Sequence, residues 1–116
     1  MRGISFTNDP GIREQPFPKN YHGELLAFLR TYINNPVGVR DASMAEPVER
    51  TVGGRLRYVS CVRYTAKDMG GKYYLTPQEI GISYVDGLLD RAVENASEAC
   101  AGADYKPFPD MEKMTR

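Results

Sequence analysis

The sequence is short of the residues that build metal centres and nucleophilic sites. Its 116 residues include 2 cysteines, 1 histidine and no tryptophan. A tetrahedral zinc site needs several cysteine or histidine ligands at short paired spacings, and no such pair occurs here. We therefore expect neither a bound metal nor a cofactor, and the sequence indicates a fold more readily than an activity.

The sequence also has no excess of basic over acidic residues or of acidic over basic ones. The 15 basic and 15 acidic side chains cancel to a formal net charge of +0 at pH 7, so no summed field attracts the chain to nucleic acid or to an anionic membrane. The apolar runs are far shorter than the roughly 18 residues that a membrane-spanning helix needs. Because 41% of the residues are hydrophobic, we nevertheless expect a soluble globular protein rather than a disordered chain.

The chain has the length of one domain, and prolines mark both of its ends. Residues 1–19 lack sustained periodicity, which predicts an extended N-terminal arm. Residues 20–103 should form an α+β domain. Residues 104–116, punctuated by Pro107 and Pro109, should form a C-terminal tail that starts extended.

One segment carries a strong helical pattern. Apolar side chains recur at helical spacing from Tyr21 to Ile33, which predicts an amphipathic helix with one buried face. Asn20 belongs to the residue types that cap helix N-termini, and Pro36 marks the end because proline disfavours the helical conformation just before it.

The middle of the chain predicts an antiparallel sheet of about four strands on which this helix packs. Residues 37–46 are a candidate edge-like strand that Pro47 ends. Residues 56–65 have apolar or aromatic groups on both faces, which is typical of a central strand. A glycine turn at Gly70-Gly71 follows, with solvated lysines beside it.

The last strands and a short helix come after this turn. Residues 79–85 and 88–93 flank Asp86-Gly87, a strong two-residue hairpin signal. A helix over 88–100 competes with this interpretation, since its apolar residues also suit a helical stripe. We favour the strand, followed by a short helix at 96–101.

The two cysteines allow two interpretations. Cys61 and Cys100 would pair as a disulfide in an oxidising compartment. Alternatively, Cys61 could be a reactive thiol whose pKa is lowered by Arg57 and Arg63. A cysteine in the middle of a strand is more often structural, and we favour the disulfide. His22 has no acid or nucleophile that the sequence places beside it, so we assign no catalytic residue.

Aromatic side chains are the best candidates for contacts with a partner. Tyrosine presents an apolar ring with a polar tip, so tyrosines on one sheet face suit binding, although packing under the helix is an equal alternative. Phenylalanines on the arms would be costly to expose unless a partner covers them. The candidate partner-binding residues are Phe6, Phe17, Tyr58, Tyr64, Tyr84 and Phe108.

Several motifs together resemble a known family. Cys61 to Tyr73, including Gly70-Gly71, follows Val39-Arg-Asp-Ala and precedes Cys100 and Tyr105-Lys-Pro-Phe-Pro. This set resembles small alphaproteobacterial envelope proteins described as lipoproteins or as secreted proteins of unknown function. The sequence departs from that pattern at Tyr64-Thr65, where the family commonly has an asparagine before the alanine, and in showing no leader or lipobox cysteine.

The resemblance implies export, and a membrane contact only through a removed or lipidated leader. It implies no catalytic residue. We therefore expect a non-catalytic cell-envelope or assembly-subunit protein, periplasmic or associated with the outer membrane, that binds another protein through its arms and a tyrosine-rich face. A cytoplasmic location remains an alternative. So do a small-ligand or peptidoglycan-binding module and, more weakly, a thiol-dependent enzyme.

Overall fold

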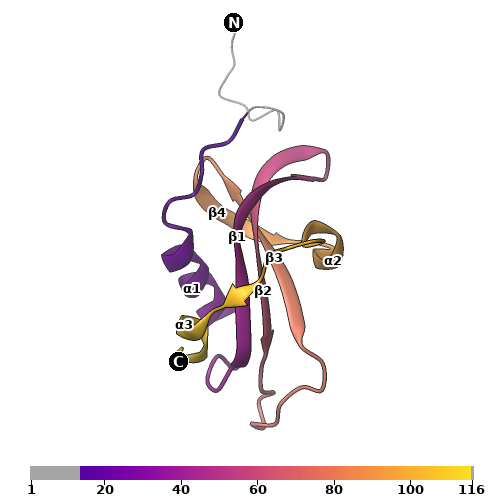
Figure 1. The fold of residues 1–116 in the computed structure, drawn as a ribbon. Coiled ribbons are helices and arrows are strands. Elements are labelled where there is room, and N and C mark those ends of the chain that lie inside the picture. The colour runs from indigo at the N-terminus through magenta and orange to yellow at the C-terminus, as the bar shows by residue number, and fades with distance from the viewer. Residues whose placement is uncertain (1–13, 116) are drawn as a thin grey trace, which may run out of the picture.

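One long helix and one sheet make up the main layers of the protein (Figure 1). The structure, a computed structural model, describes residues 14–115. The sheet is antiparallel throughout, in the order β4-β3-β2-β1-β5, which confirms the predicted α+β class with an N-terminal helix on an antiparallel sheet. The elements in chain order are α1 (Tyr21–Tyr32), β1 (Arg40–Val52), β2 (Arg55–Thr65), β3 (Gln78–Val85), β4 (Leu88–Val93), α2 (Ala96–Ala99), β5 (Lys106–Pro107) and α3 (Pro109–Glu112).

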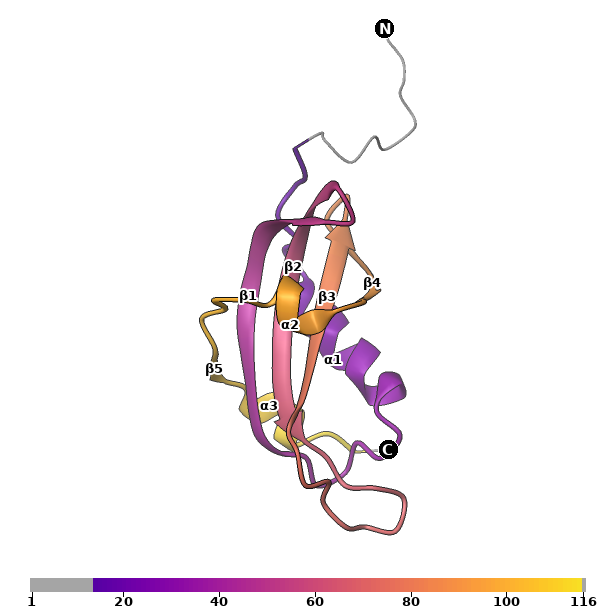
Figure 2. The same cartoon turned by 90° about the vertical axis from the view of Figure 1, so that its right-hand side faces the viewer.

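Helices cover the two faces of the sheet unequally. Figure 1 shows α1 and α3 on one face and α2 on the other. Figure 2 shows that the short α2 lies across β2 and β3, with α1 behind the sheet. We call these surfaces the α1 face and the α2 face. A helix as short as α2 leaves much of its face without helical cover.

α1 forms where the apolar stripe predicted it. The carbonyl of Asn20 accepts a hydrogen bond from the amide of Glu24 (3.1 Å), but the Asn20 side chain makes no capping bond. At the other end the amide of Ile33 donates to the carbonyl of Leu29 (3.0 Å), and Ile33 itself is extended. Pro36 follows shortly afterwards, as expected of a helix stop.

The main core lies between α1 and the sheet. Leu25 and Leu29 are completely buried there. β2 and β3 contribute alternate side chains to the same cluster, because residues two apart on a strand point to the same face. These strand residues are Val62, Tyr64, Ile80, Ile82 and Tyr84.

β1 is longer than the sequence predicted. We expected Pro47 to end this strand, but β1 continues to Val52. The pairing with β2 shifts between Ala45 and Val48, so the proline lies at a bulge, where its missing amide breaks no regular ladder bond. The proline therefore marks an irregularity in the strand and not its end.

Both two-residue turns form hairpins. Gly53 and Gly54 connect β1 to β2, and Asp86 and Gly87 connect β3 to β4; all four residues have positive φ. That backbone conformation matches the twist of the flanking strands. The strand over Leu88–Val93, followed by a short helix, is confirmed over the competing helix.

The C-terminal tail completes the main core. Its first part is extended, as predicted, and β5 pairs with Ser43 and Met44 of β1. Glu112 in α3 then accepts a hydrogen bond at Oε2 from the amide of Ala42 (3.0 Å). Three tail side chains enter the core: Phe108, Met111 and Met114. Proline spacing predicted the extended start but carried no information on this packing, which depends on residues distant in sequence.

The tail should belong to the cooperative folding unit. Met111 is completely buried, and replacing a buried methionine by alanine costs about 2–5 kcal/mol. We expect Met111→Ala to lower the free energy of unfolding by that amount in equilibrium urea denaturation. The neighbouring exposed Lys113→Ala should cost under about 0.5 kcal/mol. Equally small effects at both positions would show that the tail is a dispensable arm.

Candidate functional site

A disulfide bond anchors the α2 face. Cys61 of β2 is joined to Cys100, the residue after α2, as the even cysteine count predicted. Both are almost completely buried, in a small cluster with Ala45 and Val59. Within the described part of the chain neither cysteine is free. The oxidised protein therefore has no thiolate for the thiol-dependent chemistry that the sequence left open.

A glycine in the neighbouring strand makes room for this bond. Gly81 of β3 lies opposite Cys61 in the ladder. A Cβ at this position would lie 2.8 Å from Cγ2 of Val93 and 3.3 Å from Sγ of Cys100. Such distances are shorter than normal van der Waals contacts, so an added methyl group would force the Val93 side chain and the disulfide to shift.

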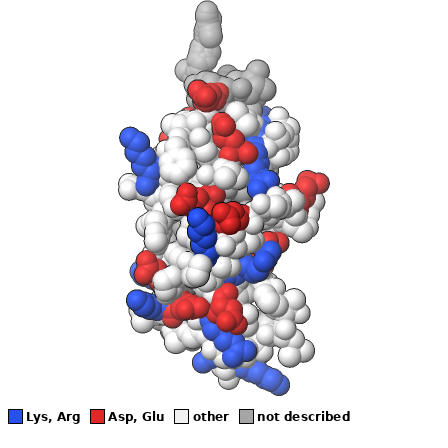
Figure 3. All heavy atoms as spheres, viewed as in Figure 1, with Lys and Arg blue, Asp and Glu red and all other residues white. Residues whose placement is uncertain are grey.

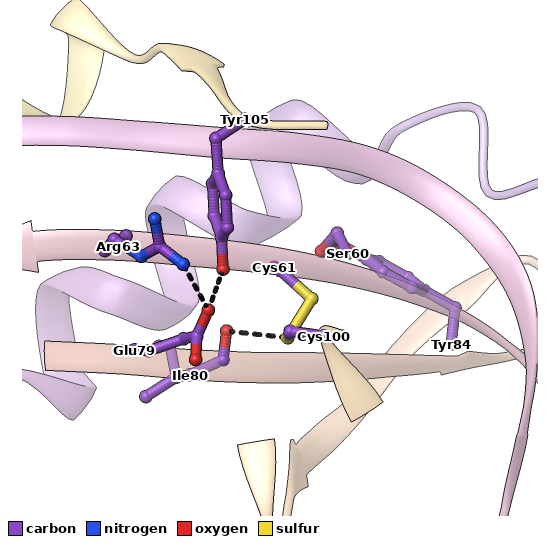
Figure 4. The surroundings of a disulfide bond; sticks show 8 residues. All are labelled: Ser60, Cys61, Arg63, Glu79, Ile80, Tyr84, Cys100 and Tyr105. Atoms are coloured by element: carbon purple, nitrogen blue, oxygen red, sulfur yellow. Dashed lines mark hydrogen bonds and ion pairs between the residues drawn. A yellow bond between two sulfur atoms is a disulfide. The ribbon is translucent and has the colours of Figure 1, made fainter. Parts of the chain in front are cut away.

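A polar clasp holds the chain after α2 onto the sheet (Figure 4). The Tyr105 hydroxyl donates to Oε2 of Glu79 (2.5 Å), and Arg63 donates to the same oxygen (3.0 Å). The Arg63 guanidinium also lies 4.1 Å from the centroid of the Tyr105 ring. Burial, followed by the bond to Glu79 and its charge, raises the pKa of Tyr105. The tyrosine therefore remains a proton donor at neutral pH and serves as a structural contact.

A groove occupies the part of the α2 face nearest the β1–β2 turn. Its volume is about 640 Å³, within the range of small-molecule sites. Arginines from β1, β2 and β4 line it, together with acidic residues from β1, from β4 and from the segment that includes α2. The charged lining residues are Glu49, Arg50, Arg55, Arg57, Asp90, Arg91, Glu94 and Glu98. Basic and acidic side chains are likewise interspersed over the face drawn in Figure 3, without a large patch of one sign.

The opposite end of the sheet presents apolar side chains to solvent. The loop between β2 and β3, residues 66–77, extends beyond the sheet at the lower end of Figure 2. Leu75 is 98% exposed and Met69 67% exposed on this loop. Tyr74, and Tyr32 at the end of α1, are about half exposed. We call the 66–77 loop together with Tyr32 the apolar end.

The loop is held in one conformation despite its exposure. Lys67 and Tyr73 form a β-bridge, and Oδ1 of Asp68 accepts bonds from the amides of Gly70 (2.9 Å) and Lys72 (3.0 Å). The Tyr73 hydroxyl donates to the carbonyl of Gly38 (2.6 Å).

A second chain segment also fixes the loop. The Arg40 guanidinium lies 4.0 Å from the centroid of the Tyr73 ring. Nδ2 of Asn35 donates to the carbonyl of Asp68 (3.0 Å). The predicted glycine turn at Gly70-Gly71 is present, with Gly71 at φ 84°, so the apolar side chains project from a defined backbone.

A pocket of about 330 Å³ opens beside the loop. Its lining includes the apolar or aromatic side chains of Tyr32, Ile33 and Tyr74 and the polar ones of Asn34, Asn35, Lys67 and Gln78. Tyr64 and Ala66, both buried, also line it. The apolar end thus combines projecting side chains with a concavity, which suits contact with a protein surface.

Three of the predicted partner-binding residues are buried instead. Tyr64 is 4% exposed, Tyr84 1% and Phe108 2%. The two tyrosines pack under α1, which was the alternative interpretation, and the Tyr84 hydroxyl lies 2.9 Å from Oγ of Ser60. Burial raises the pKa of both tyrosines to about 12. None of the three can meet a partner while the domain is folded.

Two other candidates, Phe17 and Tyr58, lie together at the surface. Phe17 is 43% exposed, and its ring contacts those of Tyr21 and Tyr58 edge-on, with centroid distances of 5.9 and 5.3 Å. Tyr58 is half-buried. Phe6 lies outside the described residues.

His22 has an acidic neighbour that the sequence could not place. Its Nε2 lies 3.2 Å from Oδ2 of Asp110, and both side chains are half exposed. The ring also contacts Phe108 at 5.2 Å between centroids. This pair connects α1 to α3 and includes no nucleophile. Within residues 14–115 no three histidine, cysteine or acidic side chains cluster as a metal site requires.

Sequence reasoning missed the apolar end and the arginine groove. Leu75 follows Tyr74 and precedes Thr76-Pro77. Apolar residues directly beside turn residues were the pattern from which an exposed apolar loop could have been predicted. The position of the groove arginines follows from the Gly53-Gly54 turn, which fixes the residues that face each other across the hairpin.

Loss of the disulfide should destabilise the domain strongly. Cys61 and Cys100 are 39 positions apart, and cross-linking a loop of that length stabilises a fold by about 3–4 kcal/mol in the chain-entropy model. We expect the double substitution Cys61→Ala and Cys100→Ala to lower the free energy of unfolding by that amount. Ready alkylation of unreduced native protein would contradict the bond itself.

A larger residue in place of Gly81 should destabilise the protein. We expect Gly81→Ala to cost about 1–3 kcal/mol through overpacking against Val93 and Cys100. Gly23 of α1 is the matched control, because an added Cβ there would meet nothing within 4 Å. Gly23→Ala should instead stabilise the protein by about 0.5–1 kcal/mol through helix propensity. Thermal melting of both variants tests the contrast, and losses of similar size at the two glycines would contradict it.

Comparisons with known proteins point to no relative. No protein-family model, curated protein or solved structure matches the chain. The resemblance to alphaproteobacterial envelope proteins therefore stays a prediction. No helix among the described residues is long and apolar enough to cross a membrane.

Proposed function

We propose that this protein is a non-catalytic component of an extracytoplasmic assembly and binds another protein through its apolar end. The observation that carries the proposal is Leu75, which is 98% exposed on a loop held by hydrogen bonds. Apolar side chains clustered on an ordered loop are typical of interaction sites. The partner contact thus moves from the predicted tyrosine face and C-terminal arm to residues 66–77 and Tyr32.

The energetics favour this loop as a contact. Burying a leucine side chain contributes about 1.5–3 kcal/mol, and Met69 and Tyr74 add apolar area beside Leu75. Because Asp68 and Tyr73 already hold the backbone in place, little conformational entropy is lost when a partner docks. The pocket next to Tyr32 gives a partner side chain a place to insert.

The disulfide supports the compartment proposed. Such bonds persist in oxidising environments and are rare in the cytosol. The Cys61–Cys100 bond is therefore compatible with an extracellular or periplasmic location. The periplasm, association with the outer membrane and a removed or lipidated leader remain parts of the proposal.

One observation favours a second candidate, a small-ligand-binding module. The groove on the α2 face has the volume of a ligand site and a charged lining. It lies near the β1–β2 turn, whereas the apolar end includes the β2–β3 loop. The two candidate functions can therefore be tested separately.

Photocrosslinking in the native host tests the protein-binding proposal. Leu75 is replaced by a benzophenone amino acid, and Leu88, which is 62% exposed on the β3–β4 hairpin, is replaced in the same way as the control. We expect position 75 to form a covalent adduct with one distinct protein and position 88 to form none with it.

The binding energetics are then measured with that purified protein. Leu75→Asp should weaken the affinity by about tenfold or more, as expected for a contact residue at the centre of an interface. Its melting temperature should be unchanged, since the native side chain touches almost nothing. Leu88→Asp should leave the affinity unchanged. Adducts of equal yield at both positions, or adducts with this chain alone, would refute a dedicated heterologous contact.

A further inference from the structure

The outer edge of β1 is paired along only part of its length. On this side β5 pairs with Ser43 and Met44, and among the described residues no other strand lies beyond β1. In Figure 2 the chain leading to β5 crosses β1 and then runs beside its lower part. The stretch from Val48 to the β1–β2 turn is therefore an open sheet edge.

The register of the β1–β2 hairpin fixes which backbone groups face this edge. Val52 and Arg55 flank the two-residue turn, so they form the hydrogen-bonded pair that closes it. Because the hydrogen-bonding direction alternates along a strand, the amides and carbonyls of Glu49 and Thr51 point outward, away from β2. Within residues 14–115 no strand or side chain pairs with these groups. They have the spacing that the backbone of a further strand matches.

The other edge of the sheet is partly blocked. In β4 the amide of Leu89 donates to Oε2 of Glu24 in α1 (3.1 Å). Open edges pair with other chains unless prolines, bulges or charges prevent it. On β1 the bulge at Pro47 limits the open stretch to its upper part, so a strand added there would be short.

A small pocket adjoins this stretch on the α2 face. Its volume is about 220 Å³, below the roughly 300 Å³ at which small-molecule sites begin, and it suits a single side chain. Its apolar lining includes Val59, Cys61 and Ala103, and also Val48, which is 44% exposed. In an added strand the residue opposite Val48 would project to this same face, beside the pocket.

The charges along the edge favour particular neighbours for that apolar residue. Nε of Arg50 has no hydrogen-bond partner among the described residues, and Arg50 lines the pocket. A carboxylate opposite Arg50 would supply an acceptor. Glu49 is exposed and points by alternation to the other face, where a basic residue opposite it is favoured. The order in an antiparallel strand is then acidic, basic, apolar from its N-terminus.

A second copy of β1 fits this edge poorly. Two-fold antiparallel pairing about Glu49 opposes two carboxylates, and pairing about Arg50 opposes two guanidinium groups, which is destabilising. The registers on either side place Glu49 opposite Pro47, which has no amide to donate, or opposite Gly53 of the turn. The charge pattern therefore favours a strand of different sequence.

We propose that the open edge of β1 binds an extended segment of another protein as an added antiparallel strand. An acidic residue of that segment lies opposite Arg50, a basic residue opposite Glu49, and an apolar side chain enters the pocket. Main-chain hydrogen bonds supply affinity in this mode of recognition, and alternate side chains supply specificity. The edge adjoins the β1–β2 turn, at the end of the sheet away from the apolar end, so this contact is independent of the function proposed above.

Titration of the full chain with a blocked pentapeptide, acetyl-threonyl-glutamyl-lysyl-leucyl-threonine amide, tests the proposal. Binding is followed by the NMR amide signals of Glu49 and Thr51. We expect both signals to shift at about 1 mM peptide, the range of a weak specific contact, and exchange of both hydrogens with solvent to slow. Replacing the leucine by serine should weaken binding by about tenfold, since less apolar area is buried.

Two N-methylated peptides separate strand addition from side-chain contact. In the proposed register the lysine amide donates to the carbonyl of Glu49, whereas the glutamate amide faces away from β1. Methylation of the lysine amide should weaken binding by at least about tenfold, because it removes the donor and crowds the space between the strands. Methylation of the glutamate amide should leave most of the affinity intact.

Variants of the chain assign the contact to β1. Thr51→Pro removes an outward amide and should abolish binding, whereas Thr51→Val keeps the amide and should preserve it. Proline is tolerated on an edge strand where its nitrogen faces solvent, and thermal melting checks that the variant folds; if it does not, the methylated peptides still decide. Arg50→Gln should remove the preference for the glutamyl peptide over its glutaminyl analogue, and Arg30→Gln on α1 should retain it.

Three results would overturn the proposal. One is unchanged signals of Glu49 and Thr51 at about 5 mM peptide, above the range of a weak specific contact. Another is equal binding of the two methylated peptides, which would identify a site for side chains alone. The third is a shift of the same signals when the protein is concentrated without peptide, which would identify a second copy as the occupant.

Discussion

The structure depends on one covalent link, the disulfide between β2 and the chain after α2. A sheet with apolar residues on both faces needs cover on both, and residues 14–115 include only one long helix. α1 and the C-terminal tail cover the first face. The second is covered by residues 94–105, a segment too short to bury a core of its own. Joining Cys100 to Cys61 holds that segment against the centre of the sheet.

The other features of the α2 face follow from this link. Gly81 must lack a side chain, because Sγ of Cys100 and the side chain of Val93 occupy the space above it. Tyr105 and Glu79 close the far side of the same segment through a hydrogen bond. The segment after β4 is thus held on this face by the disulfide and by the Tyr105–Glu79 hydrogen bond, and Gly81 leaves the space that the disulfide needs. The apolar cluster beneath it is small.

Local sequence patterns predicted the parts of the fold that local forces determine. Helix α1 was predicted from the spacing of its apolar residues, and the β3–β4 hairpin from the turn residues Asp86-Gly87. The α+β fold class and the Cys61–Cys100 disulfide were also predicted correctly. Pro47 misled the prediction because a missing amide can be accommodated at a bulge as well as at a strand end.

Long-range packing decided which of the predicted contact residues reach solvent. Tyr84 and Tyr58 lie on the same face by alternation, yet Tyr84 is covered by α1 and Tyr58 only in part. Phe108 lies on a proline-rich segment that resembles an exposed arm, and its position depends on where β1 begins, because its amide donates to the carbonyl of Ala42. Conversely, the exposure of Leu75 depends on how Asn35 and Gly38 fix the 66–77 loop, which no local pattern encodes.

The groove marks where the cover of the α2 face ends along β2. From Cys61 and Val59 the side chains on this face change to Arg57 and Arg55. Arginine stands at alternate positions here, where a buried strand would carry apolar residues, so the apolar core of this face ends before the β1–β2 turn. α2 spans only four residues, and its Glu98 and Ala99 form part of the edge of the groove. The cross-linked segment therefore covers the centre of the face with apolar side chains, and the adjoining part near the β1–β2 turn is a groove lined by charged ones.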